Sequence, residues 1–223
     1  MKNTAKLLLV PALLACAAAA QAQTAGTWMV RGGATTIKPN VSSGDLTAPS
    51  LAGTKASIGS STRLSGGITY MVDNNLSIDV PVALPFQHDI SGDGAILGAG
   101  KIGDVKALPV TALAQWRFME PTSAFRPYVG IGVTYAAFYA AKSTSTLTAI
   151  TGGTPSNPTT LSIDSKWAAT AQLGASMAID KSWFLDACYT YTPLSTRTTL
   201  STGQTLDAKL DPSSFSLAIG YKF

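Results

Sequence analysis

The sequence predicts an all-β protein, an eight-stranded antiparallel transmembrane β-barrel with short periplasmic turns and long extracellular loops. Three observations predict it. Only 13% of the 223 residues are charged, against about 25% in ordinary soluble domains. Strand-like segments recur, and each carries bulky apolar residues on one parity. The connections between them alternate between short and long, as in bacterial single-chain barrels.

The N-terminus has the features of an export signal. Lys2 and Lys6 precede an apolar stretch, Leu7 to Ala20, and Ala20-Gln21-Ala22 is a cleavage site of the A-x-A type. We therefore expect residues 1–22 to be a signal peptide and residues 23–223 to form the barrel. An alternative is a lipoprotein-type cleavage before Cys16. No later apolar run approaches the 18 residues that a transmembrane helix needs.

Charge and cysteine content exclude other classes. The formal net charge of the whole chain is only +4, too small and too scattered to indicate a nucleic-acid partner. If Cys16 leaves with the signal peptide, Cys188 is the single cysteine left, so no disulfide framework is expected. We interpret Cys188 as a small packed residue.

The first four predicted strands follow one another with clear alternation. Thr27–Lys38 sets Trp and Val against Met and Arg in WMVR. Ser57–Val72 alternates through RLSGGITYMV. Leu76–His88, read as LSIDVPVALPFQH, is the cleanest, with its bulky residues on even positions. Asp104–Met119 has apolar residues at every second place of LPVTALAQWRF, namely Leu108, Val110, Ala112, Ala114, Trp116 and Phe118.

The last four predicted strands complete an even number, as such barrels require. Arg126–Ala141 contains YVGIGVTY, with glycine and threonine between large residues. Ser165–Asp180 and Trp183–Thr198 alternate through KWAATAQLGASMAID and WFLDACYTY. The final segment is FSLAIGYKF. Short connections at 73–75 and 180–182 contrast with long ones such as Pro39–Ala56 and the stretch near LSTGQTLDAK.

The two faces of these segments differ in chemistry. The bulky parity carries almost no charge, so it is expected to face lipid, and closing the sheet would pair the backbone groups that hydrocarbon cannot. Aromatic residues near the segment ends resemble the girdles of membrane barrels. The residues assigned to these girdles are Trp28, Phe86, Trp116, Phe118, Tyr128, Tyr139, Trp167, Trp183 and Tyr221.

The other parity predicts a narrow, semi-polar lumen. Its polar members are Arg31, Arg63, Asp79, Gln115, Arg117, Gln172, Asp180, Asp186 and Lys222. Buried charges need partners, so one interpretation is a pairing network that fills and stiffens the barrel. The alternative is a set of side chains that selects solutes. Eight strands leave too little room for a wide aqueous pore.

Three prolines interrupt the strands at positions where proline is unusual. Pro81, Pro85 and Pro109 cannot donate to a sheet ladder. A hairpin centred near residue 95 would place Pro81 and Pro109 opposite each other. We hypothesise that this seam opens laterally toward lipid. The alternative is that the prolines occupy a bulge without further function.

Several stretches resemble one family along essentially the whole chain after residue 22. WMVRGGATTIKP, LPFQHDI, LPVTALAQWRF, FRPYVGIGVTYAAFY and LDPSSFSLAIGYKF are similar, in this order, to the outer membrane protein W (OmpW) family. The resemblance implies an eight-stranded barrel in a Gram-negative outer membrane, surrounded by outer-membrane lipid. It also implies uptake of small hydrophobic solutes, alkane-type molecules in some relatives, with sideways release into the membrane.

The resemblance carries further expectations for single residues. Phe86, His88 and Asp89 match a family landmark at the outer mouth of the third strand, so His88 is not expected to be catalytic. Tyr221 and Phe223 resemble the C-terminal signal read by the barrel-assembly machinery. Where some relatives narrow the lumen with large apolar side chains, this chain has Pro81 and Thr190, so no hydrophobic plug is expected.

The sequence supports other functions less well than transport. A barrel whose long loops bind phage, toxins or host surfaces is the main alternative, although loops vary freely on any barrel. An enzyme is not expected, because no nucleophile, base and acid can be grouped from the sequence. No cofactor or metal is expected, since a single histidine without cysteine partners makes a weak metal site.

Overall fold

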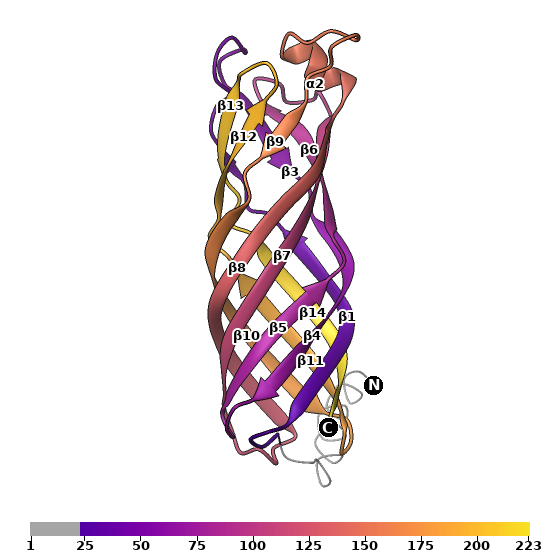
Figure 1. The fold of residues 1–223 in the computed structure, drawn as a ribbon, viewed down its shortest axis with the longest axis vertical. Helices are drawn as coiled ribbons and strands as arrows, with labels where there is room; N and C mark the ends of the chain where they lie inside the picture. The colour runs from indigo at the N-terminus through magenta and orange to yellow at the C-terminus, as the bar shows by residue number, and fades with distance from the viewer. Residues whose placement is uncertain (1–22) are drawn as a thin grey trace, which may run out of the picture.

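Antiparallel strands wrap into a closed barrel in the computed structural model, which describes residues 23–223 (Figure 1). The predicted signal peptide, residues 1–22, lies outside the described residues and stays a prediction. The elements are β1 (Trp28–Lys38), β2 (Ser42–Ser43), β3 (Thr54–Ile58), β4 (Ser61–Met71), β5 (Leu76–Ala83), β6 (Phe86–Gly94), β7 (Lys101–Arg117), β8 (Phe125–Ser143), α2 (Ser145–Ile150), β9 (Leu161–Ile163), β10 (Lys166–Ala178), β11 (Trp183–Tyr191), β12 (Ser195–Leu200), β13 (Thr205–Lys209) and β14 (Ser213–Lys222).

The barrel wall has eight strands, as the sequence predicted. Its order is β1, β4, β5 continued by β6, β7, β8, β10, β11 and β14, and pairing of β7 with β8 and of β1 with β14 closes it. At the closure, Trp28 N donates to Phe223 O at 3.0 Å and Phe223 N donates to Trp28 O at 2.9 Å. The two ends of the described chain therefore lie side by side at one rim.

That rim also carries the tight connections, so we call it the short-turn end. The opposite, long-loop end holds secondary structure in segments that the sequence predicted as loops. β2, β13, β12 and β9 form a separate four-stranded sheet, and β3 pairs with β6 above the wall. These strands are two to six residues long, which is too short for their alternation to be recognised.

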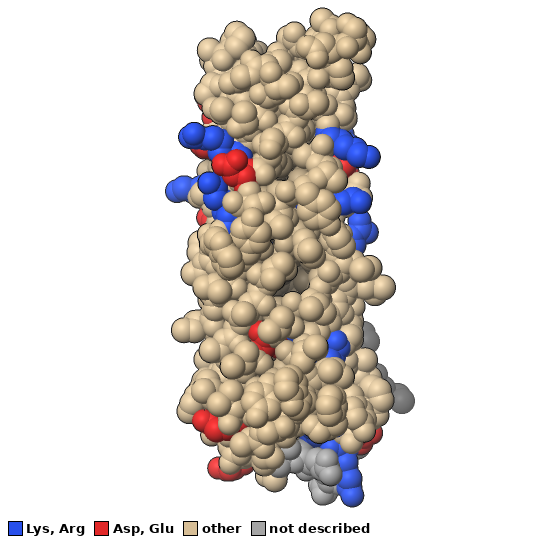
Figure 2. Space-filling view, viewed as in Figure 1, with Lys and Arg blue, Asp and Glu red and all other residues tan. Residues whose placement is uncertain are grey.

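The outer face of the wall is apolar. Ile131, Trp167 and Leu64 are 73%, 71% and 68% exposed, and they belong to the parity that the sequence assigned to lipid. An apolar band of this size would be unstable in water. Figure 2 shows it as a surface nearly free of charge below a band rich in charged side chains. Within residues 23–223, no helix is long and apolar enough to span a membrane.

The charged band includes lysines near the long-loop ends of wall strands. Lys38, Lys106, Lys142 and Lys166 are exposed on β1, β7, β8 and β10, and we call these four residues the lysine belt. Lys166 pairs with Asp164 at 3.4 Å. Ammonium groups cannot enter hydrocarbon cheaply, so the belt marks one boundary of the apolar band.

Candidate functional site

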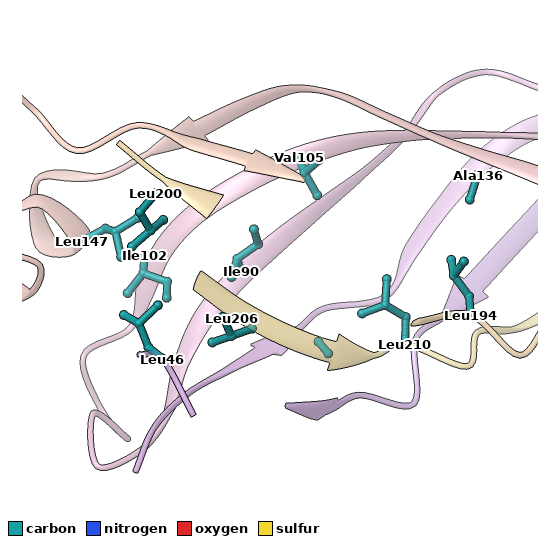
Figure 3. Packing of buried hydrophobic residues seen from close by; sticks show 11 residues of the cluster. Leu46, Ile90, Ile102, Val105, Ala136, Leu147, Leu194, Leu200, Leu206 and Leu210 are labelled. Atoms are coloured by element: carbon teal, nitrogen blue, oxygen red, sulfur yellow. The ribbon is translucent and has the colours of Figure 1, made fainter. Parts of the chain in front are cut away.

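A cavity of about 220 Å³ lies inside the barrel and extends toward the long-loop end. Its upper lining is apolar and comes from both the wall and the additional short strands. Figure 3 shows Leu46, Ile90, Ile102, Leu206 and Leu210 in this part. These side chains are inside the barrel although they lie toward the long-loop end, so the interior remains apolar there.

The lower limit of the cavity is a buried ion pair. Arg31 donates from both terminal nitrogens to the Asp79 carboxylate, at 2.7 and 2.8 Å. Thr69 Oγ1 donates to the same carboxylate at 2.6 Å. Asp186 lies 3.8 Å from Arg31 Nε. Because both acids face one guanidinium, the charge on Arg31 is well compensated.

A second layer of polar side chains fills the lumen below. Arg117 donates to Ser77 Oγ at 3.1 Å and to Gln115 Oε1 at 2.9 Å. Its guanidinium carbon stands 4.6 Å from the centre of the Tyr128 ring, a cation–π contact. Gln115 Nε2 donates to Gln172 Oε1 at 2.7 Å. The network closes the barrel by direct contacts between strands.

Tyr128 links the two layers. Its hydroxyl donates toward both oxygens of Asp186, each at 3.1 Å. Space for the ring depends on Gly174 of β10, because a Cβ there would stand 2.5 Å from the ring. Tyr128 was assigned to a lipid-facing girdle, and this assignment is wrong: the side chain is 1% exposed and points inward.

Arg126 was not among the predicted lumen residues, although it is fully buried. It donates to the carbonyl oxygens of Asn74 at 2.7 Å and Gln23 at 3.1 Å, so it joins the β4–β5 turn to the segment before β1 at the short-turn end. The signal that could have found it is its parity, which it shares with Tyr128 on β8.

The structure places most predicted lumen residues inside the barrel. Those with buried or nearly buried side chains are Arg31, Asp79, Gln115, Arg117, Gln172, Asp186 and Lys222. Arg63 is half-buried, and its Nε donates to Pro85 O at 3.2 Å.

Asp180 is not a lumen residue, which corrects the sequence interpretation. It lies in an exposed turn after β10, and its Oδ1 accepts from Ser182 N and Trp183 N, both at 2.8 Å. These two backbone donors lower the pKa of its carboxyl group. The alternation of β10 ends at Ala178, so the parity of residue 180 carries no information about the lumen.

The outer-mouth motif also differs from its predicted orientation. Phe86 was placed with the lipid-facing parity but is 1% exposed and borders the cavity. His88 is buried as well, with Nδ1 2.8 Å from Gly59 O. Asp89 points outward and accepts from Lys101 Nζ at 2.7 Å. The inward parity therefore changes between Leu84 and Phe86.

The sheet ladder is interrupted where this change occurs. Pairing of β5 with β7 stops at Asp79 and Leu113, and pairing of β6 with β7 starts at Phe86 and Ala107. Residues 80–85 and 108–112 thus face each other without ladder pairing. We call this interval the ladder gap. Figure 2 shows a hollow at about mid-height of the wall on this side.

The three predicted prolines all border the ladder gap. Pro81 and Pro109 are not directly opposite each other, because extending the register of Asp79 and Leu113 places Pro81 beside Thr111. Val82 is 53% exposed on the outer wall and also borders the cavity. The cavity therefore adjoins the wall at the ladder gap.

Comparison with known proteins gives consistent matches over the described chain. A family model described as the OmpW family matches residues 24–223. Outer membrane protein W of Vibrio cholerae serotype O1 is 35% identical over 202 residues, covering 89% of each chain. Outer membrane protein W of Escherichia coli K12 is 32% identical over 225 residues, covering 100% of this chain and 99% of that protein.

A solved structure agrees with the architecture. The crystal structure of the outer membrane protein OprG from Pseudomonas aeruginosa superimposes with a TM-score of 0.80 at 28% identity. The match covers 92% of this chain and 99% of that chain.

In residues 23–223, no group of three His, Cys, Asp or Glu side chains could hold a metal ion.

Proposed function

Because the chain belongs to the OmpW family and is an outer-membrane β-barrel, we propose that it carries small hydrophobic molecules across the outer leaflet and releases them sideways into the membrane. The observation that carries the proposal is the contact between an apolar cavity and the ladder gap. The free energy of an apolar solute falls when it leaves water, so a continuous apolar route favours such cargo.

The polar floor supports an exit through the wall. Arg31 is paired with Asp79, and in the layer below Gln115 bonds to both Arg117 and Gln172. An apolar molecule that moved through these two layers would separate buried charge-assisted hydrogen bonds. The ladder gap lies beside the cavity above this floor. The route of lower cost for an apolar molecule is therefore lateral.

Proline makes an opening in the wall tolerable in lipid. An unpaired backbone N–H in hydrocarbon costs several kcal/mol, and Pro81, Pro85 and Pro109 have no N–H to leave unpaired. Their presence on both sides of the ladder gap reduces the cost of keeping the strands apart. This is our interpretation of the three prolines as lateral-seam residues.

The seam is tested by replacing Pro81, Pro85 and Pro109 together with valine, which restores three donors. Uptake of radiolabelled n-octane by cells with an intact outer membrane should fall toward the rate of cells that lack the protein. A matched control is Pro127→Val in β8, which pairs with Ala175 away from the gap; this variant should transport like the wild type.

Two outcomes would contradict the proposal. If the folded triple variant takes up octane as fast as the wild type, release does not use the ladder gap. If the wild type itself gives no faster uptake than cells without it, the barrel has a structural role or binds partners through its outer loops.

Assembly is a separate part of the proposal. Tyr221 and Phe223 lie on the outward face of the closing strand, 38% and 67% exposed. We propose that the barrel-assembly machinery recognises them. Aromatic side chains that remain exposed in the closed barrel are also accessible to another protein before the barrel closes.

A further inference from the structure

Two chains of hydroxyl groups line the wall at the lower part of the cavity. In the first, Thr111, Thr134, Thr170 and Thr192 are joined across β7, β8, β10 and the end of β11. The successive oxygen–oxygen distances are 2.8, 2.6 and 3.0 Å. All four side chains are buried, and three of them border the cavity directly.

The second chain lies on the other strands of the wall. Thr35 Oγ1 of β1 is 2.7 Å from both Ser65 Oγ of β4 and Ser216 Oγ of β14. These three residues also border the cavity. Seven of the eight wall strands or their ends thus contribute a hydroxyl, and the remaining strand, β5, contributes Pro81 and Ala83 at the ladder gap.

Each chain retains a hydrogen that its own bonds do not use. A hydroxyl has one hydrogen to donate and two lone pairs to accept with. Four hydroxyls joined by three bonds leave one O–H without an acceptor among the described residues. In the second chain, three hydroxyls joined by two bonds also leave one O–H, and its nearest acceptor is the sulfur of Cys188 beside Ser216, a weaker acceptor than oxygen. Because hydroxyls rotate, the spare donor can move along its chain and meet a group in the cavity.

The surroundings restrict what that group can be. Toward the long-loop end the cavity is lined by leucine, isoleucine and valine, which suit a hydrocarbon tail. A pure alkane would displace water from the hydroxyls without replacing its hydrogen bonds, which is costly. An ionised head group would not bind favourably either, because the guanidinium of Arg31 already makes two hydrogen bonds to the carboxylate of Asp79.

From these contacts we infer that the cavity preferentially binds medium-chain molecules with one neutral hydrogen-bonding head group, a primary alcohol being the simplest. The head group accepts from a hydroxyl chain while the tail fills the apolar part. The inference rests on the proposed function and specifies its cargo. It also implies that the head group leaves last when the tail enters the membrane through the ladder gap.

The test compares initial uptake of radiolabelled n-octane, octan-1-ol and octanoate by intact cells, with and without the protein. The first variant replaces Thr111, Thr134, Thr170 and Thr192 together with valine, which removes every hydroxyl of the first chain. The second variant combines Thr35→Val with Ser65→Ala and Ser216→Ala, which removes every hydroxyl of the second chain. Valine keeps the shape of threonine. The control is Thr36→Val, since the Thr36–Thr62 pair is exposed and does not border the cavity.

We expect the protein-dependent ratio of octanol to octane uptake to fall about five-fold in each chain variant, because a net hydrogen bond is lost. Thr36→Val should keep the wild-type ratio. Unchanged ratios in both folded variants would overturn the inference while octane uptake still supports transport. Fastest uptake of octanoate would overturn it in favour of a charged head group. Absence of any protein-dependent uptake would overturn transport itself.

Discussion

Arg31 and its two acids form a group of coupled charges inside the barrel. The guanidinium makes a two-bond pair with Asp79 and approaches Asp186 at 3.8 Å. Asp186 in turn accepts from Tyr128. Removal of one partner would leave a buried charge with too few bonds, which costs more than the pair itself contributes.

At this scale the first prediction concerns Asp79→Asn. The change keeps the shape of the side chain and removes its charge, so Arg31 keeps its hydrogen bond to Thr69 and the more distant carboxylate of Asp186. The free energy of unfolding should fall by about 3 kcal/mol. Denaturant-induced unfolding of the barrel in lipid vesicles, followed by tryptophan fluorescence, measures this change.

The matched control is Asp207→Asn. Asp207 also makes a two-bond pair, with Arg197 at 2.7 and 2.8 Å, but the pair is exposed on β12 and β13. Solvent screens such pairs, so the midpoint of unfolding should barely move. Equal losses in the two variants would show that burial does not determine the strength of the Arg31 pair.

Single residues show how far alternation predicts the interior. It correctly assigned the inward side chains of Arg31, Asp79, Gln115, Arg117 and Asp186, because each lies within a regular strand. It failed where a strand ends or changes phase. The end of β10 is marked by the short connection predicted at 180–182, which excludes Asp180 from the strand. The shift before Phe86 depends on the neighbouring strands, so alternation within one strand does not reveal it.

At the scale of elements, the β3–β4 segment and the β5–β6 segment lie side by side, and in both the inward-facing parity changes at the same height. Inward residues have even numbers in β3 and β6, as in Ile58 and Ile90, but odd numbers in β4 and β5. The pairing of Ile58 with Ile90 and of Ser65 with Ala83 nevertheless follows one register. Both the β3–β4 segment and the β5–β6 segment thus contain one extra residue where the parity changes, and β7 contains none at that height.

The register difference explains the ladder gap and predicts how to close it. Deleting Gly59 and Pro85 together would remove both extra residues while keeping every inward side chain inward. The β5–β6 strand could then pair with β7 without interruption. NMR of the labelled barrel in lipid should show new contacts between the backbone amides of Val82 and Val110, and octane uptake should fall.

A single deletion of Pro85 serves as the comparison for this element. It should align β6 with β7 but shift it against β3, so the long-loop end should lose stability. If the folded double-deletion variant shows no contact between Val82 and Val110, the gap has a cause other than register.

The sequence predicted the eight wall strands because each crosses the wall with long, regular alternation. It did not predict β2, β9 and β13, and it merged parts of β3 and β12 with the wall strands Ser57–Val72 and Trp183–Thr198, because these five strands are short and rich in serine and threonine. Their stability comes from pairing with each other and from covering the apolar cluster around Leu200 and Leu206. Such tertiary support cannot be read from a period of two.

At the scale of the whole molecule, the lysine belt separates two environments of the same barrel. Below it the apolar side chains face outward, and above it the apolar cluster lies inside. The wall therefore continues beyond the membrane, and there its apolar side chains face the inside of the barrel instead of the outside. This explains how one closed sheet can be compatible with lipid at one height and with water at the other.

The position of the membrane can be tested with single cysteines. Lys106→Cys and Ile131→Cys are both exposed in the isolated barrel, and Ile131 is the more so at 73%. Lipid should nevertheless cover residue 131. A membrane-impermeant maleimide added to intact cells should label residue 106 and leave residue 131 unlabelled.

Cys188 is buried and contributes little background to this labelling. In detergent-free unfolded protein, both introduced cysteines should react, which shows that the reagent can modify each position. Labelling of residue 131 in intact cells at the rate of residue 106 would contradict the assigned membrane boundary.

The barrel contains two copies of one terminal pattern. β14 leads into Tyr221-Lys222-Phe223, and β7 leads into Trp116-Arg117-Phe118; in both, the aromatic side chains point outward and the basic side chain points inward at the short-turn rim. Trp28 and Phe223 already lie next to each other. A circular permutant that joins these ends and opens after Phe118 would therefore keep the wall order and still finish on an aromatic, basic, aromatic triplet. Assembly of such a chain would show whether the final aromatic, basic, aromatic triplet is sufficient for recognition, or whether β14 itself must be the last strand.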